Sequence, residues 1–101
     1  MTFALLIKHK TQPGKREDVR AVWEKHMAPA ISANAGHMAY FYCFDEVDED
    51  SIVAFQQYKD VKASRRFLKN ESYIAYLKEV EPLLLGPPMV TSLALKWSKT
   101  L

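Results

Sequence analysis

Three histidines and five tyrosines are the side chains of this sequence best suited to chemistry on a small molecule. A histidine has a pKa near neutrality, so it can take a proton from a substrate at physiological pH. A tyrosine hydroxyl donates a hydrogen bond to an oxygen anion, and its ring forms an apolar wall beside an aromatic ligand. These residue types are able to support acid–base chemistry and to contact an aromatic ligand.

The three histidines occupy different settings in the sequence. His9 ends the first apolar run on the same side as Ile7, so it either faces a cavity or is a solvated residue at a strand end. His26 falls on the apolar stripe of a predicted helix, where we expect a partly buried ring with a structural hydrogen bond. His37 follows a glycine, and we interpret it as finishing a turn. His9 is therefore the candidate base.

Aromatic and amide side chains supply the candidate ligand contacts. The tyrosines either pack in a core or interface or contact an aromatic substrate, and both alternatives stay open for Tyr40, Tyr42, Tyr58, Tyr73 and Tyr76. Gln56 lies on an otherwise apolar row of a predicted strand, where a buried amide needs a partner or a ligand. An interface hydrogen bond and a substrate contact are both compatible with this position.

Other chemistries are disfavoured by spacing. The acidic run from Asp45 to Asp50 lacks the glycine and the distal glutamate of a calcium loop, so we interpret it as a solvated turn. No histidine and cysteine cluster has metal-ligand spacing, and the glycines stand only at positions 14, 36 and 86. The sequence therefore predicts no metal site and no phosphate-binding loop.

Length and charge limit the class of protein. The 101 residues predict one domain over residues 1–101. Fourteen basic and twelve acidic residues give a net charge of +2, which is too weak to suggest nucleic acid as a partner. With one cysteine, and an opening apolar run too short for a signal peptide or a membrane span, we expect a cytoplasmic protein without membrane contact.

Hydrophobic periodicity predicts an order of strands and helices. Alternating or apolar runs predict strands over residues 3–10, 37–45, 51–58 and 89–97. Spacing of three and four predicts helices over residues 15–34, 61–69 and 71–85, with Asp60 capping the second and Pro29 kinking or ending the first near Met27 or Ala28. This order predicts an α+β, ferredoxin-like split βαβ fold with an antiparallel sheet and its helices on one face.

The predicted strands are apolar on both faces. In the second strand one row holds Met38, Tyr40, Tyr42 and Phe44, and the other row holds Ala39, Phe41 and Cys43. Helices can cover only one face of a sheet, and soluble monomers rarely expose an apolar face of this size. We therefore expect a homodimer in which two sheets meet and form a barrel-like core.

Several segments together resemble the antibiotic biosynthesis monooxygenase domain. They are the turn Thr11-Gln12-Pro13-Gly14, the pair Gly36-His37, the strand from Ser51 to Tyr58, and the stretch from Arg66 through Val80. The likeness spans roughly Phe3 to Trp97. The resemblance implies a dimeric α/β barrel. It also implies the activity of the active family members, including quinol monooxygenases, which oxidise quinols or polycyclic phenols with molecular oxygen and no metal or flavin.

The resemblance also implies where the site lies. The family cavity is between the sheet and the helices, and the matching positions here are Ile7, His9, Tyr58, Phe67, Ser72, Tyr73, Tyr76 and Leu77. Ser72 stands where quinol monooxygenase members often carry a histidine. The haem-degrading branch uses an asparagine, a tryptophan and a histidine at the positions of Ile7, Phe67 and Leu77, so the resemblance argues against haem degradation.

Two hypotheses of function follow. The first is a cofactor-free monooxygenase that oxidises a quinol or related phenol, with His9 as base and Tyr76 as hydrogen-bond donor. Its substrate contacts are expected from Ile7, Gln56, Tyr58, Phe67, Ser72, Tyr73 and Leu77. The alternative is a non-catalytic dimeric barrel that binds a small aromatic metabolite or a protein partner. An isomerase or decarboxylase on the same fold stays open as a third class.

Overall fold

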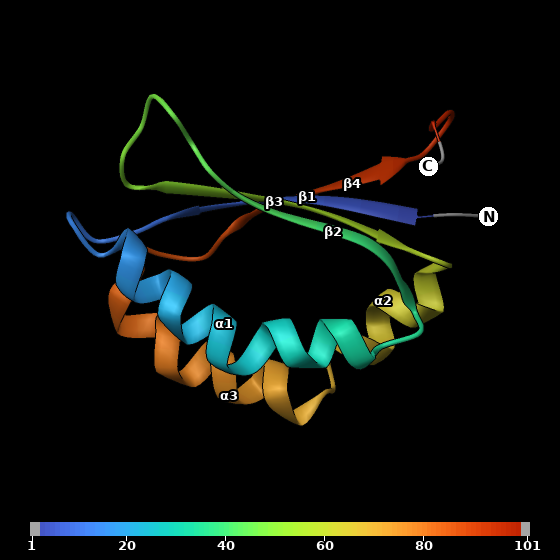
Figure 1. Ribbon diagram of the computed structural model, residues 1–101, viewed down its shortest axis with the longest axis horizontal. Helices are drawn as coiled ribbons and strands as arrows, with labels where there is room; N and C mark the ends of the chain where they lie inside the picture. The colour runs from blue at the N-terminus through green and yellow to red at the C-terminus, as the bar shows by residue number, and fades with distance from the viewer. Residues whose placement is uncertain (1–2, 100–101) are drawn as a thin grey trace.

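The chain folds into a four-stranded antiparallel sheet with its helices on one face (Figure 1). The computed structural model describes residues 3–99. Its strands, β1 (Phe3–Lys10), β2 (His37–Phe44), β3 (Ser51–Tyr58) and β4 (Met89–Ala94), lie in the order β2-β3-β1-β4. The helices are α1 (Arg16–Ala33), α2 (Val61–Phe67) and α3 (Glu71–Val80), followed by a 3-10 turn at Glu81–Leu83. The predicted α+β, ferredoxin-like fold is confirmed.

Helix α1 continues past Pro29, where the sequence predicts either a kink or an early end. Pro29 is exposed and lies inside the helix, which runs on to Ala33. Ala30 and Ile31, just beyond the proline, pack against the buried core. Burying this last turn outweighs the one backbone hydrogen bond that a proline cannot donate. The expectation of an early end near Met27 or Ala28 is therefore wrong.

The last helix and the last strand are shorter than predicted. Helix α3 gives way to the 3-10 turn where Pro82 removes a donor from the α-helical pattern. Strand β4 pairs with β1 from Met89, opposite Lys8, to Ala94, opposite Phe3. Trp97 lies beyond this ladder and is 79% exposed. The expected strand to Trp97 is wrong because apolar alternation without a pairing partner does not make a strand.

A β-bulge at the start of β2 changes which side chains share a face. The register shifts between His37, opposite Tyr58, and Ala39, opposite Gln57, so Met38 is the extra residue. Met38 is 58% exposed, and its sulfur lies 4.0 Å from Nε2 of Gln57. It does not share the inner row with Tyr40 and Tyr42, as simple alternation predicted. His37 instead turns its ring to the helix side, where it meets Tyr58 at 4.3 Å between ring centroids.

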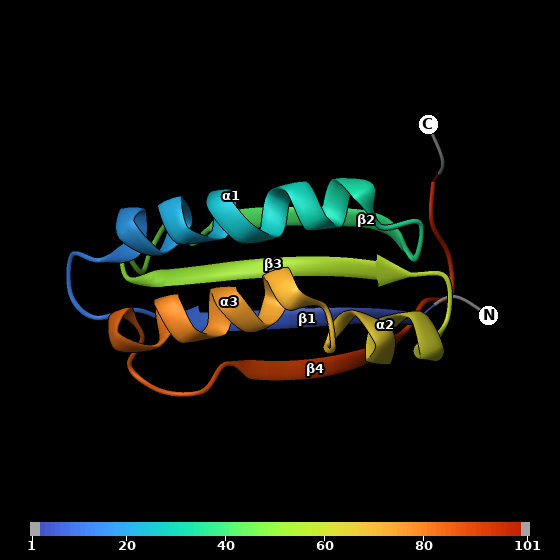
Figure 2. The same cartoon turned by 90° about the horizontal axis from the view of Figure 1, so that it is seen from below.

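The core lies between the helix-facing side of the sheet and the helices. Figure 2 shows α1 above β2 and α3 beside β3 and β1, with β4 at the edge of the sheet. The most buried apolar side chains come from both layers: Val19, Val22, Met27, Ile52, Tyr58, Ala63, Phe67, Tyr76 and Val80. No helix among residues 3–99 is long and apolar enough to cross a membrane.

The acidic segment between β2 and β3 is a tight turn with its polar groups engaged. Asp45 accepts backbone hydrogen bonds from Val47 at 2.8 Å and Asp48 at 2.9 Å. Nη1 of Arg16 donates to the carbonyl oxygens of Asp45, Asp48 and Ser51 at 2.8, 3.1 and 3.1 Å. These contacts tie the turn to α1 and use its oxygens internally, in agreement with a turn rather than a calcium loop.

Asp60 caps α2, so its removal should measure the value of this cap. Its carboxylate accepts the backbone N–H of Ala63 at 2.7 Å. We expect Asp60→Ala to lower the free energy of unfolding by about 1 kcal/mol, measured by urea denaturation. Asp60→Asn keeps a capping oxygen and should stay near wild type. Equal losses in both variants would show that the cap is not the source of the effect.

Candidate functional site

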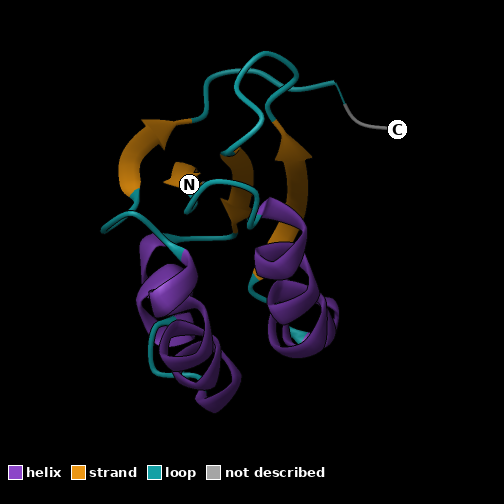
Figure 3. Ribbon diagram, turned by 90° about the vertical axis from the view of Figure 1, so that its left-hand side faces the viewer, coloured by secondary structure: helices purple, strands orange, loops and turns teal. Residues whose placement is uncertain are grey.

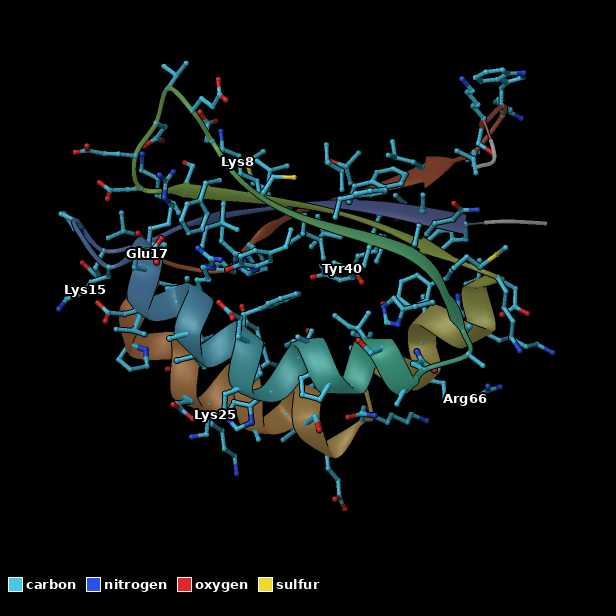
Figure 4. The ribbon with its side chains drawn as sticks, viewed as in Figure 1. Lys8, Lys15, Glu17, Lys25, Tyr40 and Arg66 are labelled. Carbon is cyan, nitrogen blue, oxygen red and sulfur yellow. The ribbon has the colours of Figure 1, made fainter. Side chains whose placement is uncertain are left out.

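An apolar cavity of about 410 Å³ lies between the inner face of the sheet and the helices. Figure 3 shows the helices in two columns beneath the strands, and Figure 4 shows Tyr40 in the layer between them. All four strands and all three helices contribute to its wall, with these side chains: Phe3, Leu5, Ile7, His9, Trp23, Met27, Tyr40, Tyr42, Ala54, Gln56, Tyr58, Ser64, Phe67, Leu68, Tyr73, Tyr76, Leu77, Pro88 and Val90.

Every tyrosine of the chain lines this cavity. Burial raises the pKa of all five hydroxyls, that of Tyr40 to about 12 despite a hydrogen bond from Trp23 that lowers it. The hydroxyls therefore stay protonated at neutral pH and are available as hydrogen-bond donors. The rings also build a wall: that of Tyr42 stacks on Trp23 at 4.2 Å, and that of Tyr73 lies 5.9 Å from Phe67.

No charged side chain is among the described residues that line the cavity. Lysine, arginine, aspartate and glutamate are confined to other surfaces, such as the outer sides of the helices where Lys25 and Glu79 pair at 3.0 Å. An ionic ligand would lose its hydration without gaining a counter-charge. The cavity therefore suits an uncharged, largely apolar ligand with a small number of polar atoms.

His9 brings the one imidazole into this lining. Burial lowers its pKa below the usual value, so the ring is neutral at pH 7 and has a nitrogen free to accept a proton. Its Nδ1 is buried and has no hydrogen-bond partner among the described residues, and the same holds for the hydroxyl of Tyr42. Buried polar atoms are rarely left unpaired, so two of them in one cavity wall indicate a place for the polar groups of a ligand.

A second polar region of the cavity is centred on Gln56. Its side chain is 4% exposed, and its Oε1 accepts the hydroxyl hydrogen of Tyr58 at 2.7 Å. Nε2 of His37 lies 3.3 Å from the same oxygen. Register places Gln56 beside Leu5 and Tyr40, whereas His9 lies beside Ile52 nearer the other end of β3. The two polar regions are thus separated along the sheet by several residues.

Eight of the nine residues expected in the site line one cavity: Ile7, His9, Gln56, Tyr58, Phe67, Tyr73, Tyr76 and Leu77. The exception is Ser72, which lies in the first turn of α3 with its backbone N–H bonded to Asn70 Oδ1 at 2.8 Å. It is outside the set of described residues that line the cavity, because the first-turn geometry places Tyr73 and Tyr76 on the inner side of this helix instead.

Other lining residues were not predicted as site residues. They include Tyr40 and Tyr42, for which the sequence leaves core packing and substrate contact open, and Trp23 and Met27 of α1. The signal for the tyrosines was present in the inner row of β2. The space beside Trp23 is not visible in a sequence, because a helix stripe looks the same whether it fills a core or borders a cavity.

His26 serves a structural contact. His26 lies outside the cavity lining, with its side chain 18% exposed and its Nε2 2.8 Å from Glu79 Oε1. This confirms the partly buried, hydrogen-bonded ring expected on α1. Among residues 3–99, no group of three or more histidine, cysteine, aspartate or glutamate side chains is arranged to hold a metal ion.

The stability of the protein should depend on pH through its buried histidines. Burial lowers the pKa of His9 and, although the hydrogen bond that His37 donates to Gln56 opposes the shift, that of His37, while both rings titrate normally once unfolded. Below about pH 6.5 the unfolded chain therefore binds more protons, so the free energy of unfolding falls as the pH falls through that value and is constant above it.

Urea denaturation at pH 7.5 and 5.5 checks this expectation. The wild type should lose stability at the lower pH, and His9→Gln should lose less. The carboxylates with lowered pKa values, such as Asp45 and Glu79, titrate below this window and do not confound it. A His9 resonance that titrates at or above pH 6.5 in NMR spectra would contradict the prediction.

Comparison with known proteins agrees with this architecture. A sequence model of the antibiotic biosynthesis monooxygenase family matches residues 2–79. Among solved structures, Rv0793 from Mycobacterium tuberculosis is 24% identical with a TM-score of 0.85, covering 99% of this chain and 100% of its own. A protein from Chloroflexus aurantiacus, named "putative Antibiotic biosynthesis monooxygenase", is 16% identical with a TM-score of 0.85, covering 99% and 98%.

PA3566 from Pseudomonas aeruginosa is 22% identical with a TM-score of 0.84, covering 95% of both chains. No curated protein sequence is significantly similar to this chain. At these identities the structural likeness shows the fold, and the family match over residues 2–79 shows membership. The chain therefore belongs to the antibiotic biosynthesis monooxygenase family.

Proposed function

We propose that this protein is a cofactor-free monooxygenase that oxidises a quinol or a related phenolic aromatic. The observation that carries the proposal is the cavity itself, a space of about 410 Å³ with aromatic walls and a neutral imidazole. Among residues 3–99, no charged side chain lines it and no hydrogen-bond partner reaches Nδ1 of His9. Family membership supports oxygenation as the reaction class. The volume lies at the lower end of the range for ligand pockets, which favours a single small aromatic molecule.

His9 is proposed as the base. A phenol hydroxyl beside its neutral imidazole loses its proton to the ring, and Tyr76 donates a hydrogen bond to the oxygen anion that forms. Burial raises the pKa of Tyr76, so the tyrosine remains the donor and does not compete as an acid. The apolar lining leaves the phenolate poorly solvated and electron-rich.

The reaction balances with molecular oxygen as the only oxidant. The quinol gives four electrons to one O₂, one oxygen atom replaces a ring hydrogen as a hydroxyl group, and the other leaves as water. The product is a hydroxyquinone, formed as the two ring hydroxyls of the quinol become carbonyl groups. The proton held by His9 returns when water is formed, so the enzyme ends in its starting state.

The outer face of the sheet supports the proposal that the protein is a homodimer. Its side chains include Leu6 at 38%, Phe41 at 59% and Met89 at 71% exposure, with Val53 and Phe55 between them on β3. Lys8, between Val53 and Met89, interrupts this otherwise largely apolar surface. Apolar exposure on this scale favours association, and a two-fold contact covers it on both subunits at once. Two sheets packed in this way make a barrel with the cavities on its outside, beneath the helices.

Oxygen uptake with a panel of hydroquinones tests the activity. We expect consumption above the uncatalysed rate for at least one compound, and a loss of about 100-fold in kcat/KM for His9→Gln because a general base is removed. His26→Gln is the matched control, since this histidine lies outside the cavity. Ligand binding without oxygen uptake would favour a non-catalytic binding protein, and turnover under anaerobic conditions would favour an isomerase or decarboxylase.

The dimer is tested by a charge on the outer face. Phe41→Asp places two carboxylates into the proposed interface, so the variant should sediment as a monomer at micromolar concentration where the wild type is a dimer. Val47→Asp is the control, because Val47 is 96% exposed in the turn between β2 and β3. A monomeric wild type would contradict the proposed assembly without bearing on the oxygen assay.

A further inference from the structure

A chain of hydrogen bonds runs from the backbone at the start of β2 to the cavity. The backbone N–H of Gly36 donates to Asn34 Oδ1 at 3.3 Å, and Asn34 Nδ2 lies 2.8 Å from Nδ1 of His37. His37 Nε2 lies 3.3 Å from Gln56 Oε1, which also accepts from the hydroxyl of Tyr58 at 2.7 Å. Gln56 and Tyr58 line the cavity, whereas His37 stands behind them.

The backbone N–H of Gly36 determines which atoms donate and which accept along this series of hydrogen bonds. A backbone N–H can only donate, so the Asn34 atom facing Gly36 must be the oxygen. The amide nitrogen of Asn34 then faces His37 and donates to Nδ1, which must be the unprotonated ring nitrogen. Burial lowers the pKa of His37, so the ring is neutral and carries its single proton on Nε2.

His37, and not Tyr58, decides how the Gln56 amide is turned. A tyrosine hydroxyl both donates and accepts, so it bonds equally well to either end of a glutamine amide. An Nε2–H group only donates, so the Gln56 atom beside it must be the carbonyl oxygen. Both hydrogen bonds therefore engage Oε1, and neither engages the amide nitrogen. The N–H donors of Gln56 are left for the cavity.

We propose that His37 is a positioning residue that orients the Gln56 amide so that its N–H groups face the cavity. This end of the cavity then selects aromatic ligands that carry an acceptor oxygen, such as a carbonyl or a phenolate. The inference rests on the proposed function only in taking the cavity as the ligand site. An acceptor oxygen meets the Gln56 amide hydrogens, whereas a group without lone pairs leaves these hydrogens desolvated and unpaired.

The residues at the start of this hydrogen-bond series are closely packed, and position 36 is a glycine. A Cβ there would lie 3.0 Å from the Cβ of Ala63, tighter than an ordinary contact, and at van der Waals distance, 3.5 Å, from Asn34 Oδ1, so the backbone packs closely against α2 beside the Asn34 amide. The imidazole of His37 is also held by packing, at 4.3 Å from the ring of Tyr58 and edge-on to Phe67 at 4.6 Å. Its two nitrogens are thereby aimed at Asn34 and Gln56.

The tautomer of His37 is the first test, and it uses the wild-type protein alone. Two-bond ¹H–¹⁵N spectra of the imidazole at pH 7.5 should show the proton on Nε2 and a bare Nδ1. A free neutral imidazole populates both tautomers, with Nε2–H in the majority, so the diagnostic result is a single Nε2–H form without a detectable Nδ1–H form. Protonation on Nδ1 would overturn the proposal, because the Gln56 amide would then be free to turn its oxygen to the cavity.

Selectivity between two probes of equal size is the second test. We expect calorimetry to show that 1-tetralone, which carries a carbonyl, binds about tenfold more tightly than tetralin, as one satisfied buried hydrogen bond allows. His37→Phe keeps the aromatic packing and removes both nitrogens, so this ratio should fall close to one. His37→Gln, which restores a donor, should recover part of it, and His26→Phe should leave it unchanged.

The outcomes separate this inference from the proposed activity. A ratio that is unaffected in His37→Phe, or failure of both probes to bind the wild type, would overturn the positioning role. Neither result requires oxygen uptake. A different result is an oxygen assay that gives no activity while the His37 tautomer and the ratio of probe affinities are as expected. That result would contradict the monooxygenase proposal and would still support the positioning role of His37.

Discussion

Strand β3 lies between β1 and β2, and its pairing register determines which side chains meet in the cavity. On the inner face, Gln56 lies between Leu5 and Tyr40, and Tyr58 lies between Phe3 and His37. A slip of one residue would turn every one of these side chains to the other face. The site is therefore a property of the register, and both of its polar regions depend on the same ladder.

The same ladder leaves room for a ligand. Ala54 stands between Ile7 and Tyr42 on the inner face, and its small side chain adds little volume where its neighbours carry larger ones. The helices bury the two ends of this face through Val19, Val80 and Phe67, while aromatic rings border the space between them. An apolar cavity of this kind is stable when its polar atoms are few and nearly all paired.

The two polar regions of the cavity differ in what they offer. His9 presents a neutral nitrogen without a partner within residues 3–99, which suits a proton acceptor, whereas Gln56 has its oxygen engaged by His37 and Tyr58 and is proposed to present its donors. A phenolic ligand has a hydroxyl to deprotonate and, after oxidation, a carbonyl oxygen to bind. Electrostatics beyond these groups is weak, since charged residues pair on outer surfaces, as Arg20 does with Glu24.

The sequence by itself determined the order of strands and helices and the apolar character of both sheet faces, because period-two and period-3.6 patterns follow from local backbone geometry. Most of the candidate site residues came instead from the family resemblance of the sequence. Only the tertiary structure decided the bulge at Met38, the inward turn of His37, the absence of Ser72 from the cavity wall and the continuation of α1 past Pro29. Each of these depends on packing or pairing with residues distant in the sequence, and local patterns carry no information about such partners.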